Sequence, residues 1–340
     1  MLELSPRQRT ILNLVIQEYI VTASPVGSEA IVRRRALGIS PATVRNEMVE
    51  LERGGYLYQP HTSAGRVPSN KGYRFFVEIL LQASELPPDE QRTISHQFHQ
   101  VELELDQWTQ LAASILARTV RTTAMVTAPS RPTCCLKHLE LVSVQDALTL
   151  LVVVLQEGHL RQQMLSLPEA MEQDNLSKAA HRLTAHFKGL SATEVMGKAL
   201  DLSAAETHVR DALVRIMRQV DASSHNEMVY DGLADMLRQP EFSGSERIRE
   251  ILEALERRAI LAVLLPKLGS YQDVQVIIGE ENTWPPLQEC AVVLARYGIV
   301  GEAGGMLGVL GPTRLAYGRA IPAVRYLSRI MTDLLREVYA

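Results

Sequence analysis

Residues 39–69 read ISPATVRNEMVELERGGYLYQPHTSAGRVPS, and this stretch decides the fold of the first part of the chain. A serine followed by a proline starts the helix predicted over 41–53, and two consecutive glycines end it. One side of this helix is apolar, with Val44, Met48 and Leu51 at helical spacing. The opposite side is polar, so the helix is predicted to pack by one face and to present the other.

The segments on either side of this helix complete a small DNA-binding fold. Two helices are predicted before it, over 5–22 and 28–35, and each begins at a serine. A short strand at 56–58, a polar loop at 61–68 and a helix from 71 to 81 follow it. Three helices, a short strand and a polar loop in this order predict a winged helix-turn-helix.

The polar side of helix 41–53 is the predicted DNA-reading surface. Arginine bonds to guanine through two hydrogen bonds, asparagine bonds to adenine in the same way, and alanine or a threonine methyl packs on thymine. The loop at 61–68 is the predicted wing, in which Gly65 permits a tight turn, and the cations just after it suit phosphate contacts. The predicted DNA-binding residues are Ser40, Ala42, Thr43, Arg45, Asn46, His61, Thr62, Ser63, Arg66, Lys71 and Arg74.

The polar face of helix 41–53 and the arginines at 33–35 each have a simpler interpretation. A polar helix face usually does no more than face water, but the capped turn before this helix and the basic loop after it favour DNA. For Arg33, Arg34 and Arg35, two interpretations stay open. They are a solvated helix end whose cations complement the helix dipole, or a contact with phosphate.

The charge of the chain is divided unevenly along its length. Residues 1–80 hold ten Lys and Arg against seven Asp and Glu, a net charge of +3, in a chain of 340 residues with a net charge of -4. The rest carries -7, and a basic end on an acidic body suits a nucleic-acid-binding segment. The three cysteines lack the spacing of a disulfide framework or a zinc site, and no signal peptide or membrane span is evident. We therefore expect a cytoplasmic protein without a membrane partner.

The rest of the chain alternates between strand and helix patterns. The predicted strands lie within 138–167, 274–279, 291–296 and 306–310. The predicted helices lie at 89–121, as one long helix or a helix pair, and at 172–187, 203–222, 226–238, 246–262 and 321–338. Strands thus flank a helical block of roughly eighty residues, which indicates an insertion into an α+β domain.

Several stretches of the sequence resemble the motifs of one protein family. They are LSPRQRTILNLVIQEYIVTASPVGSEAI (4–31), ISPATVRNEMVELERGGYLYQPHTSAGRVPSNKGYRFFVE (39–78), VYDGLADMLRQPEF (229–242), VIIGEEN (276–282) and GMLGVLGPTRLAYGRAI (305–321). In this order they resemble the HrcA family of heat-inducible transcription repressors, and the resemblance covers nearly the whole chain.

The resemblance implies a fold class and a domain organisation. The fold is α+β and multidomain, with an N-terminal winged helix, a GAF-like α/β domain and an inserted, mainly helical dimerisation domain. The predicted winged-helix domain is 1–85, the GAF-like domain is 86–190 with 268–340, and the dimerisation domain is 191–267.

The resemblance also implies a function in the stress response. Members of the family are dimeric repressors of heat-shock (chaperone) operons, bind double-stranded DNA at an inverted-repeat operator called CIRCE, and depend on the chaperonin for their activity. The residues agree with this, because a dimer with two-fold symmetry needs a palindromic site in which each head reads one half.

Motifs of other chemistry are weak, so we predict no enzyme, no cofactor and no metal. The glycine run 305–311 lacks the lysine of a phosphate-binding loop and is interpreted as strand glycines. His96 and His99 with Glu102 are interpreted as a solvated helix face. Two alternatives stay open: a regulator whose GAF-like body binds a small molecule, and an enzyme that uses the body as a catalytic domain. The second is disfavoured because no acid/base or metal set is evident.

Overall fold

The protein is described here by a computed structural model that divides into two compact units. The main unit comprises Met1–Pro129, Met228–Val300 and Gly304–Ala340, and the inserted unit comprises Ser130–Glu227 and Gly301–Ala303. The structure describes residues 4–34, 38–62, 64–80, 85–101, 105–129, 133–156, 160–224, 228–242, 249–251, 253, 255, 264, 273–299 and 302–339.

The first part of the main unit, residues 4–80, is called the head below. The first and third helices begin where their serine caps predict, because Ser5 and Ser40 each accept a hydrogen bond from a backbone N–H of the first turn. Ser69, which was not predicted as a cap, accepts the same kind of bond at the start of the fourth helix. Strands β1 and β2 pair in antiparallel fashion. The elements of the head are α1 (Pro6–Thr22), α2 (Ser28–Arg34), α3 (Pro41–Arg53), β1 (Leu57–Tyr58), β2 (Val67–Pro68), α4 (Asn70–Phe75) and the π-helical turn η1 (Phe76–Leu80).

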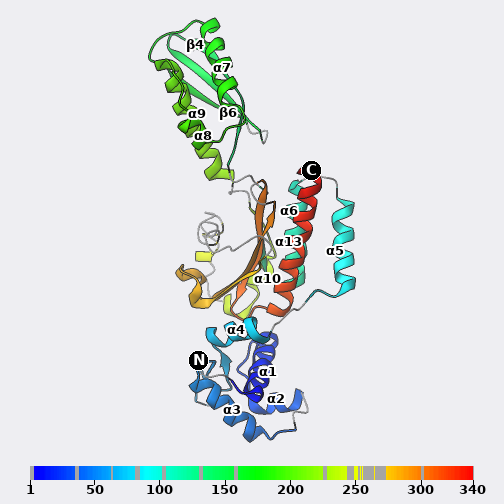
Figure 1. The fold of residues 1–340 in the computed structure, drawn as a ribbon. Helices are drawn as coiled ribbons and strands as arrows, with labels where there is room; N and C mark the ends of the chain where they lie inside the picture. Colours follow the sequence, from blue (N-terminus) through cyan, green and yellow to red (C-terminus); the bar gives the residue numbers. More distant parts are fainter. Residues whose placement is uncertain are drawn as a thin grey trace. The chain divides into compact units, whose positions relative to one another are not determined.

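The rest of the main unit, called the body, is built on an antiparallel five-stranded sheet in the order β7-β3-β10-β9-β8. Helices α6 and α13 cover one face of this sheet, and α5 packs on them (Figure 1). The opposite face carries α10 and a separate apolar cluster that includes Met125, Met236 and Leu287. The strands are β3 (Thr123–Thr127), β7 (Met228–Asp231), β8 (Gln275–Ile278), β9 (Cys290–Gly298) and β10 (Gly304–Pro312). The helices are α5 (Pro88–Gln100), α6 (Leu105–Val120), α10 (Leu233–Leu237) and α13 (Tyr317–Tyr339), with short turns η2 (Pro240–Phe242), η4 (Gly279–Glu281) and η5 (Pro285–Leu287).

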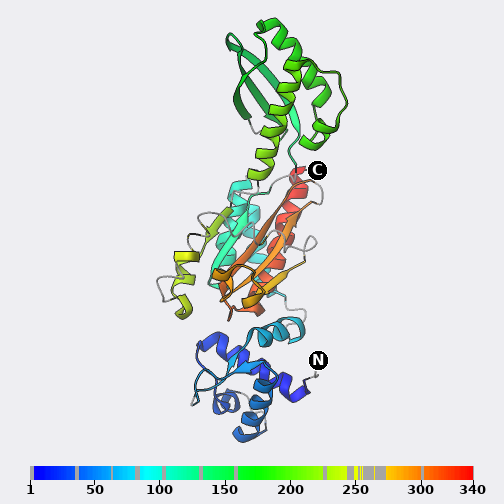
Figure 2. The ribbon, with the colours of Figure 1, turned by 90° about the vertical axis from the view of Figure 1, so that its left-hand side faces the viewer.

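The inserted unit is a three-stranded antiparallel sheet packed on helices (Figure 2). Alternate residues of the strands, such as Leu139, Leu151 and Leu165, are buried in a core shared with helix residues such as Leu183 and Leu213. The elements are β4 (Leu136–Gln145), β5 (Leu148–Leu155), β6 (Leu160–Ser166), α7 (Gln173–Phe187), α8 (Ala192–Gly197) and α9 (Ala204–Ser224).

The compact units divide the chain at other residues than the predicted domains, whose inner boundaries lie at 190 and 267. The strands β4–β6 were predicted in the GAF-like domain, but they share a core with α7–α9 and do not join the five-stranded sheet. The inserted unit is therefore mixed α and β rather than mainly helical. Strand β7 also lies inside a predicted helix at 226–238. The helix predicted at 246–262 falls largely outside the described residues.

Candidate nucleic-acid interface

Helix α3 packs by the side that its spacing predicts. Val44 and Leu51 are fully buried and Met48 is nearly so, within the same apolar cluster as residues of α1 and α2. At its start, the Ser40 hydroxyl accepts from the Thr43 N–H at 3.2 Å and lies 3.0 Å from the Thr43 hydroxyl. The cap and the buried stripe together fix which side of α3 faces outward.

The outward side of α3 is polar and open. Ala42, Arg45 and Asn46 are exposed, and Thr43 is half-buried. Within the part of the chain that the structure describes, the side chains of Arg45 and Asn46 form no hydrogen bond or ion pair. Their neighbour Glu47 instead pairs with Arg7 of α1, at 3.6 Å. The two side chains best suited to base edges are therefore available for an outside partner.

Arg53 is a member of this surface that sequence reasoning missed. At about 100° per residue, positions 42, 46 and 53 fall within a narrow stripe opposite the buried side. The Arg53 side chain is 73% exposed, and its guanidinium lies 2.7 Å from the Glu50 carboxylate one turn earlier. The helical angle was the signal that could have found it.

The loop between β1 and β2 extends from the head with His61 and Thr62 exposed. The Gln59 amide holds it by donating to the carbonyls of Thr62 and Ala64, at 3.0 and 2.9 Å. Ser63, also predicted to bind DNA, lies outside the described residues. The loop thus presents two of its predicted polar residues to solvent.

Gly65 has a different role from the one predicted. A Cβ at this position would lie 2.5 Å from the carbonyl carbon and oxygen of Val26, closer than real side chains approach backbone. Its φ angle is not positive, so a tight turn is not what requires glycine here. The loop needs glycine because it runs directly against the chain before α2, where Val26 and Arg66 exchange backbone hydrogen bonds.

Arg66 faces inward. Its guanidinium lies 2.9 Å from the Glu52 carboxylate, and the side chain is only 15% exposed. The Glu52 carboxylate offsets the cost of removing this cation from water. Arg66 thus joins the loop to the end of α3 rather than presenting its charge to a ligand.

The Lys71 ammonium is also bound within the protein. Its ammonium donates to the Gly54 carbonyl at 2.7 Å and lies 4.4 Å from the centre of the Tyr56 ring. The Gly54 carbonyl is at the C-terminal end of α3, where a cation complements the helix dipole. Lys71 therefore caps α3.

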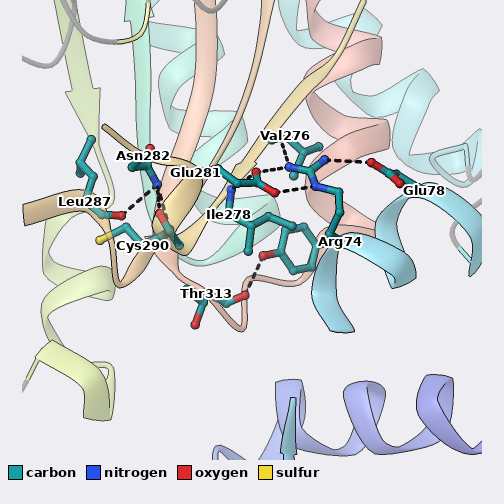
Figure 3. A network of polar contacts seen from close by, with 11 residues as sticks. Arg74, Glu78, Val276, Ile278, Glu281, Asn282, Leu287, Cys290 and Thr313 are labelled. Carbon is teal, nitrogen blue, oxygen red and sulfur yellow. Dashed lines mark hydrogen bonds and ion pairs between the residues drawn. The ribbon is translucent and has the colours of Figure 1, made fainter. Parts of the chain in front are cut away.

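Arg74 joins the head to the body. Its guanidinium forms two hydrogen bonds with the Glu281 carboxylate, one of them at 2.8 Å, and donates to the Val276 carbonyl at 2.7 Å (Figure 3). Glu78 lies 3.7 Å away on the same helical segment. Burial lowers the pKa of Arg74, but the hydrogen bond and the charge of Glu281 outweigh burial and raise it. Arg74 therefore stays charged and bound within the protein.

The structure describes the basic end of α2 only in part. Arg33 lies 3.7 Å from Glu29, and both side chains are more than three-quarters exposed. The side chains of Arg34 and Arg35 lie outside the described residues, so both interpretations of this basic end remain open. Across the described ranges, no three His, Cys, Asp or Glu side chains gather as a metal site would require. The same ranges contain no helix with the length and apolarity of a membrane span.

Comparison with known proteins places the chain among transcription regulators. The family model described as "HrcA protein C terminal domain" matches residues 106–321. A relative from Roseiflexus castenholzii, named heat-inducible transcription repressor HrcA, is 46% identical, with 99% of this chain and 96% of the relative covered. A relative of the same name from Herpetosiphon aurantiacus is 45% identical, over 99% of this chain and 97% of its own.

One solved structure has a comparable fold over the full length. It is described as a crystal structure of a hypothetical protein, with a TM-score of 0.61, 24% identity and 98% of both chains covered. The named relatives show the class of this protein, which is a negative regulator of transcription in the heat-shock response. The chain belongs to the HrcA family.

Proposed function

We propose that this chain represses chaperone operons by binding, as a homodimer, an inverted-repeat operator of the CIRCE type. The observation that carries the proposal is the outward side of α3, where Arg45 and Asn46 are exposed and uncommitted among the described residues. Phosphate contacts would give affinity, and these side chains would give base specificity. The protein acts in the cytoplasm as a regulator and not as an enzyme.

The head is proposed to be a winged helix-turn-helix. Helices α2 and α3 form the helix-turn-helix, α3 enters the major groove, and the β1–β2 loop is the wing. The proposed contact residues are Ser40, Ala42, Thr43, Arg45, Asn46, Arg53, His61 and Thr62. Arg66, Lys71 and Arg74 are assigned to contacts within the protein. The body is proposed to be a GAF-like domain that carries the inserted unit.

The inserted unit is proposed to form the dimer through the sheet face that its helices leave uncovered. On β5, the half-buried Leu150, Val152 and Val154 lie on this face. Val142 and Met164 flank Leu150 in the register of the sheet, and Leu160 lies beside Val154. Leu160 is 56% exposed and Met164 is 45% exposed.

An apolar sheet face of this kind is self-complementary when two copies meet about a two-fold axis. The occupant we propose is therefore a second copy of the chain, because an inverted repeat needs two heads related by the same symmetry. Met164→Asp would place a charge on this face and should shift the sedimentation coefficient from dimer to monomer. A variant that still sediments as a dimer would contradict this surface.

Base reading is tested by footprinting the purified protein on the chaperonin promoter of its own genome. Arg45→Ala should weaken operator binding by about 1–3 kcal/mol and relax the preference at one base pair. The control is Arg92→Ala, which removes an exposed arginine from α5 of the body. An unchanged footprint and affinity for Arg45→Ala would contradict the role of α3.

Chaperonin dependence is tested separately, with the same footprint measured with and without added chaperonin. We expect chaperonin to raise the fraction of protein that binds the operator after warming. Loss of binding at a fixed temperature, whatever the amount of free chaperonin, would point to melting of the repressor itself.

A further inference from the structure

We propose that a clamp between the head and the body, centred on Arg74 and Glu281, fixes the direction of α3 and thereby sets the half-site spacing that the dimer accepts. The inference rests on the proposed function, since spacing has meaning only for a dimer that reads two half-sites. Arg74 and Glu281 are positioning residues in this proposal and do not touch DNA.

The clamp is a multiple contact rather than a single surface ion pair. The Arg74 guanidinium binds both carboxylate oxygens of Glu281 and the Val276 carbonyl (Figure 3). A planar guanidinium held at three acceptors has its direction fixed as well as its position. The Arg74 side chain is 28% exposed and that of Glu281 is 39% exposed, so water weakens the pair without removing it.

The body holds its half of the clamp in place. The Glu281 carboxylate also accepts from the Ile278 N–H, at 2.8 Å. The next residue, Asn282, is fully buried and its amide donates to three backbone carbonyls, at Gly279, Leu287 and Cys290. These bonds fasten the turn η4 to the loop before β9 (Figure 3). Arg74 therefore binds an anchor that is itself fixed to the central sheet.

Two further contacts between α4 and the body lie beside the Arg74–Glu281 pair. A Cβ on Gly279 would lie 2.4 Å from the Asn70 side chain, so this residue of α4 packs directly on the η4 backbone. The rings of Tyr73 and Tyr317 lie 5.8 Å apart between their centres, and both are buried. Three residues of one short helix thus contact the body.

A second arginine, Arg314 of the body, contacts the head at a different helix. Arg314, in the loop after β10, donates to the Ile20 carbonyl near the end of α1 at 3.1 Å. The same guanidinium pairs with Glu241 at 2.5 Å. The head is therefore held at α1 and at α4, and two separate points of attachment prevent it from turning about either one.

Helix α4 transmits this restraint to α3. Lys71 caps the C-terminal end of α3 at the Gly54 carbonyl, and a Cβ on Gly72 would lie 2.3 Å from the Tyr56 carbonyl oxygen. No larger residue would allow α4 to lie so close to the chain that leaves α3. A head that is rigid inside and clamped to the body presents α3 in one direction only. Two such heads in one dimer would tolerate a narrower range of half-site spacings than two heads that are free to turn on their bodies.

The experiment measures spacing selectivity with the full-length protein. The probes are duplexes with the footprinted inverted repeat, in which the spacer between half-sites is unchanged or altered by one or two base pairs. A duplex with one half-site reports base reading alone. Selectivity is the ratio of affinities for the native and altered spacers.

The test variant is Glu281→Gln, which keeps an oxygen for the Ile278 N–H but removes the charge and one acceptor from Arg74. The matched control is Glu90→Gln. It removes the Glu90–Arg319 pair at 2.9 Å, whose carboxylate is 37% exposed, but which joins two helices of the body. Arg74→Lys keeps the charge and loses the two-point contact.

We expect Glu281→Gln to lower the selectivity ratio by about threefold to tenfold, with half-site affinity unchanged. This is less than the loss of a buried charge-assisted hydrogen bond, because the pair is partly exposed. Arg74→Lys should fall between this variant and the wild type, and Glu90→Gln should match the wild type. Full selectivity in Glu281→Gln, or an equal loss in Glu90→Gln, would overturn the proposal. A wild-type protein that binds neither the inverted repeat nor the half-site would instead overturn the proposed function.

Discussion

Helices α3 and α4 of the head both carry polar side chains that the sequence predicts for DNA, yet they use them differently. On α3, the side chains of Arg45 and Asn46 are exposed and make no hydrogen bond or ion pair among the described residues. On α4, Lys71 donates to the end of α3, and Arg74 binds Glu281 and the Val276 carbonyl. A cation close to a reading surface is therefore poor evidence for nucleic-acid binding when its hydrogen bonds join its helix to another part of the protein.

The difference follows from what surrounds each helix. Helix α3 has one buried side and one open side, so its outward residues meet only water. Helix α4 contacts both the end of α3 and the body, where backbone carbonyls at Gly54 and Val276 need donors. Cations on α4 supply those donors. The four predictions below test this contrast, beginning with the largest expected effect.

Substitutions on the buried side and on the open side of α3 should differ in their effect on the free energy of unfolding. Leu51→Ala removes a fully buried side chain and should lower the free energy of unfolding by about 2–5 kcal/mol. Asn46→Ala, on the open side, should change it by less than about 0.5 kcal/mol. Denaturant titration followed by circular dichroism measures both variants. A destabilised Asn46→Ala protein would mean that the outward side packs against something.

Replacing the arginine of α4 should reduce stability, whereas replacing the arginine of α3 should reduce operator affinity. Arg74→Ala leaves Glu281 and the Val276 carbonyl without their donor and should cost about 1–2 kcal/mol of stability, because the site is partly exposed. Arg45→Ala should leave the melting temperature unchanged and reduce operator affinity instead. The measurement pairs a thermal melt with a titration of the single half-site for each variant. Equal effects in both assays would remove the distinction between the helices.

Local signals explain why α3 could be predicted in detail. Its cap, its apolar spacing and its terminal glycines lie within sixteen residues, and the buried set Val44, Met48 and Leu51 is the predicted one. The exposed set follows from the same helical angle. The start, the end and the buried side of this helix can therefore be predicted from its own sequence.

The partners of α4 could not be predicted, because they come from distant segments. Glu281 lies 207 residues after Arg74, and no local pattern in the sequence brings the two together. The inserted unit shows the same limit, since an alternating strand does not reveal which sheet it joins. For this reason the sequence predicts strands within 138–167, where β4–β6 largely lie, but it does not show that they form a sheet of their own.

Salt dependence should distinguish the two arginines at the far end of α3 and in the loop. Arg53 is 73% exposed, and Arg53→Ala should reduce the slope of log affinity against log salt by about 1, as for one lost phosphate contact. Arg66 pairs with Glu52 and is 15% exposed, so Arg66→Ala should leave that slope unchanged. Fluorescence anisotropy at a series of potassium chloride concentrations gives both slopes. If Arg66→Ala alone changed its slope, the assignment of these two side chains would be reversed.

The smallest effect is expected at Lys71. Lys71→Met keeps a long aliphatic side chain against Tyr56 but removes the ammonium from the Gly54 carbonyl and from the aromatic ring. Each of these contacts is exposed at the end of a helix, so the loss in the free energy of unfolding should be about 0.5–1 kcal/mol. The salt slope of operator binding should not change, because the charge is used at α3 and not at phosphate. A slope reduced by about 1 with unchanged stability would show that Lys71 leaves its carbonyl when DNA binds, and the contrast between the helices would then hold only for the free protein.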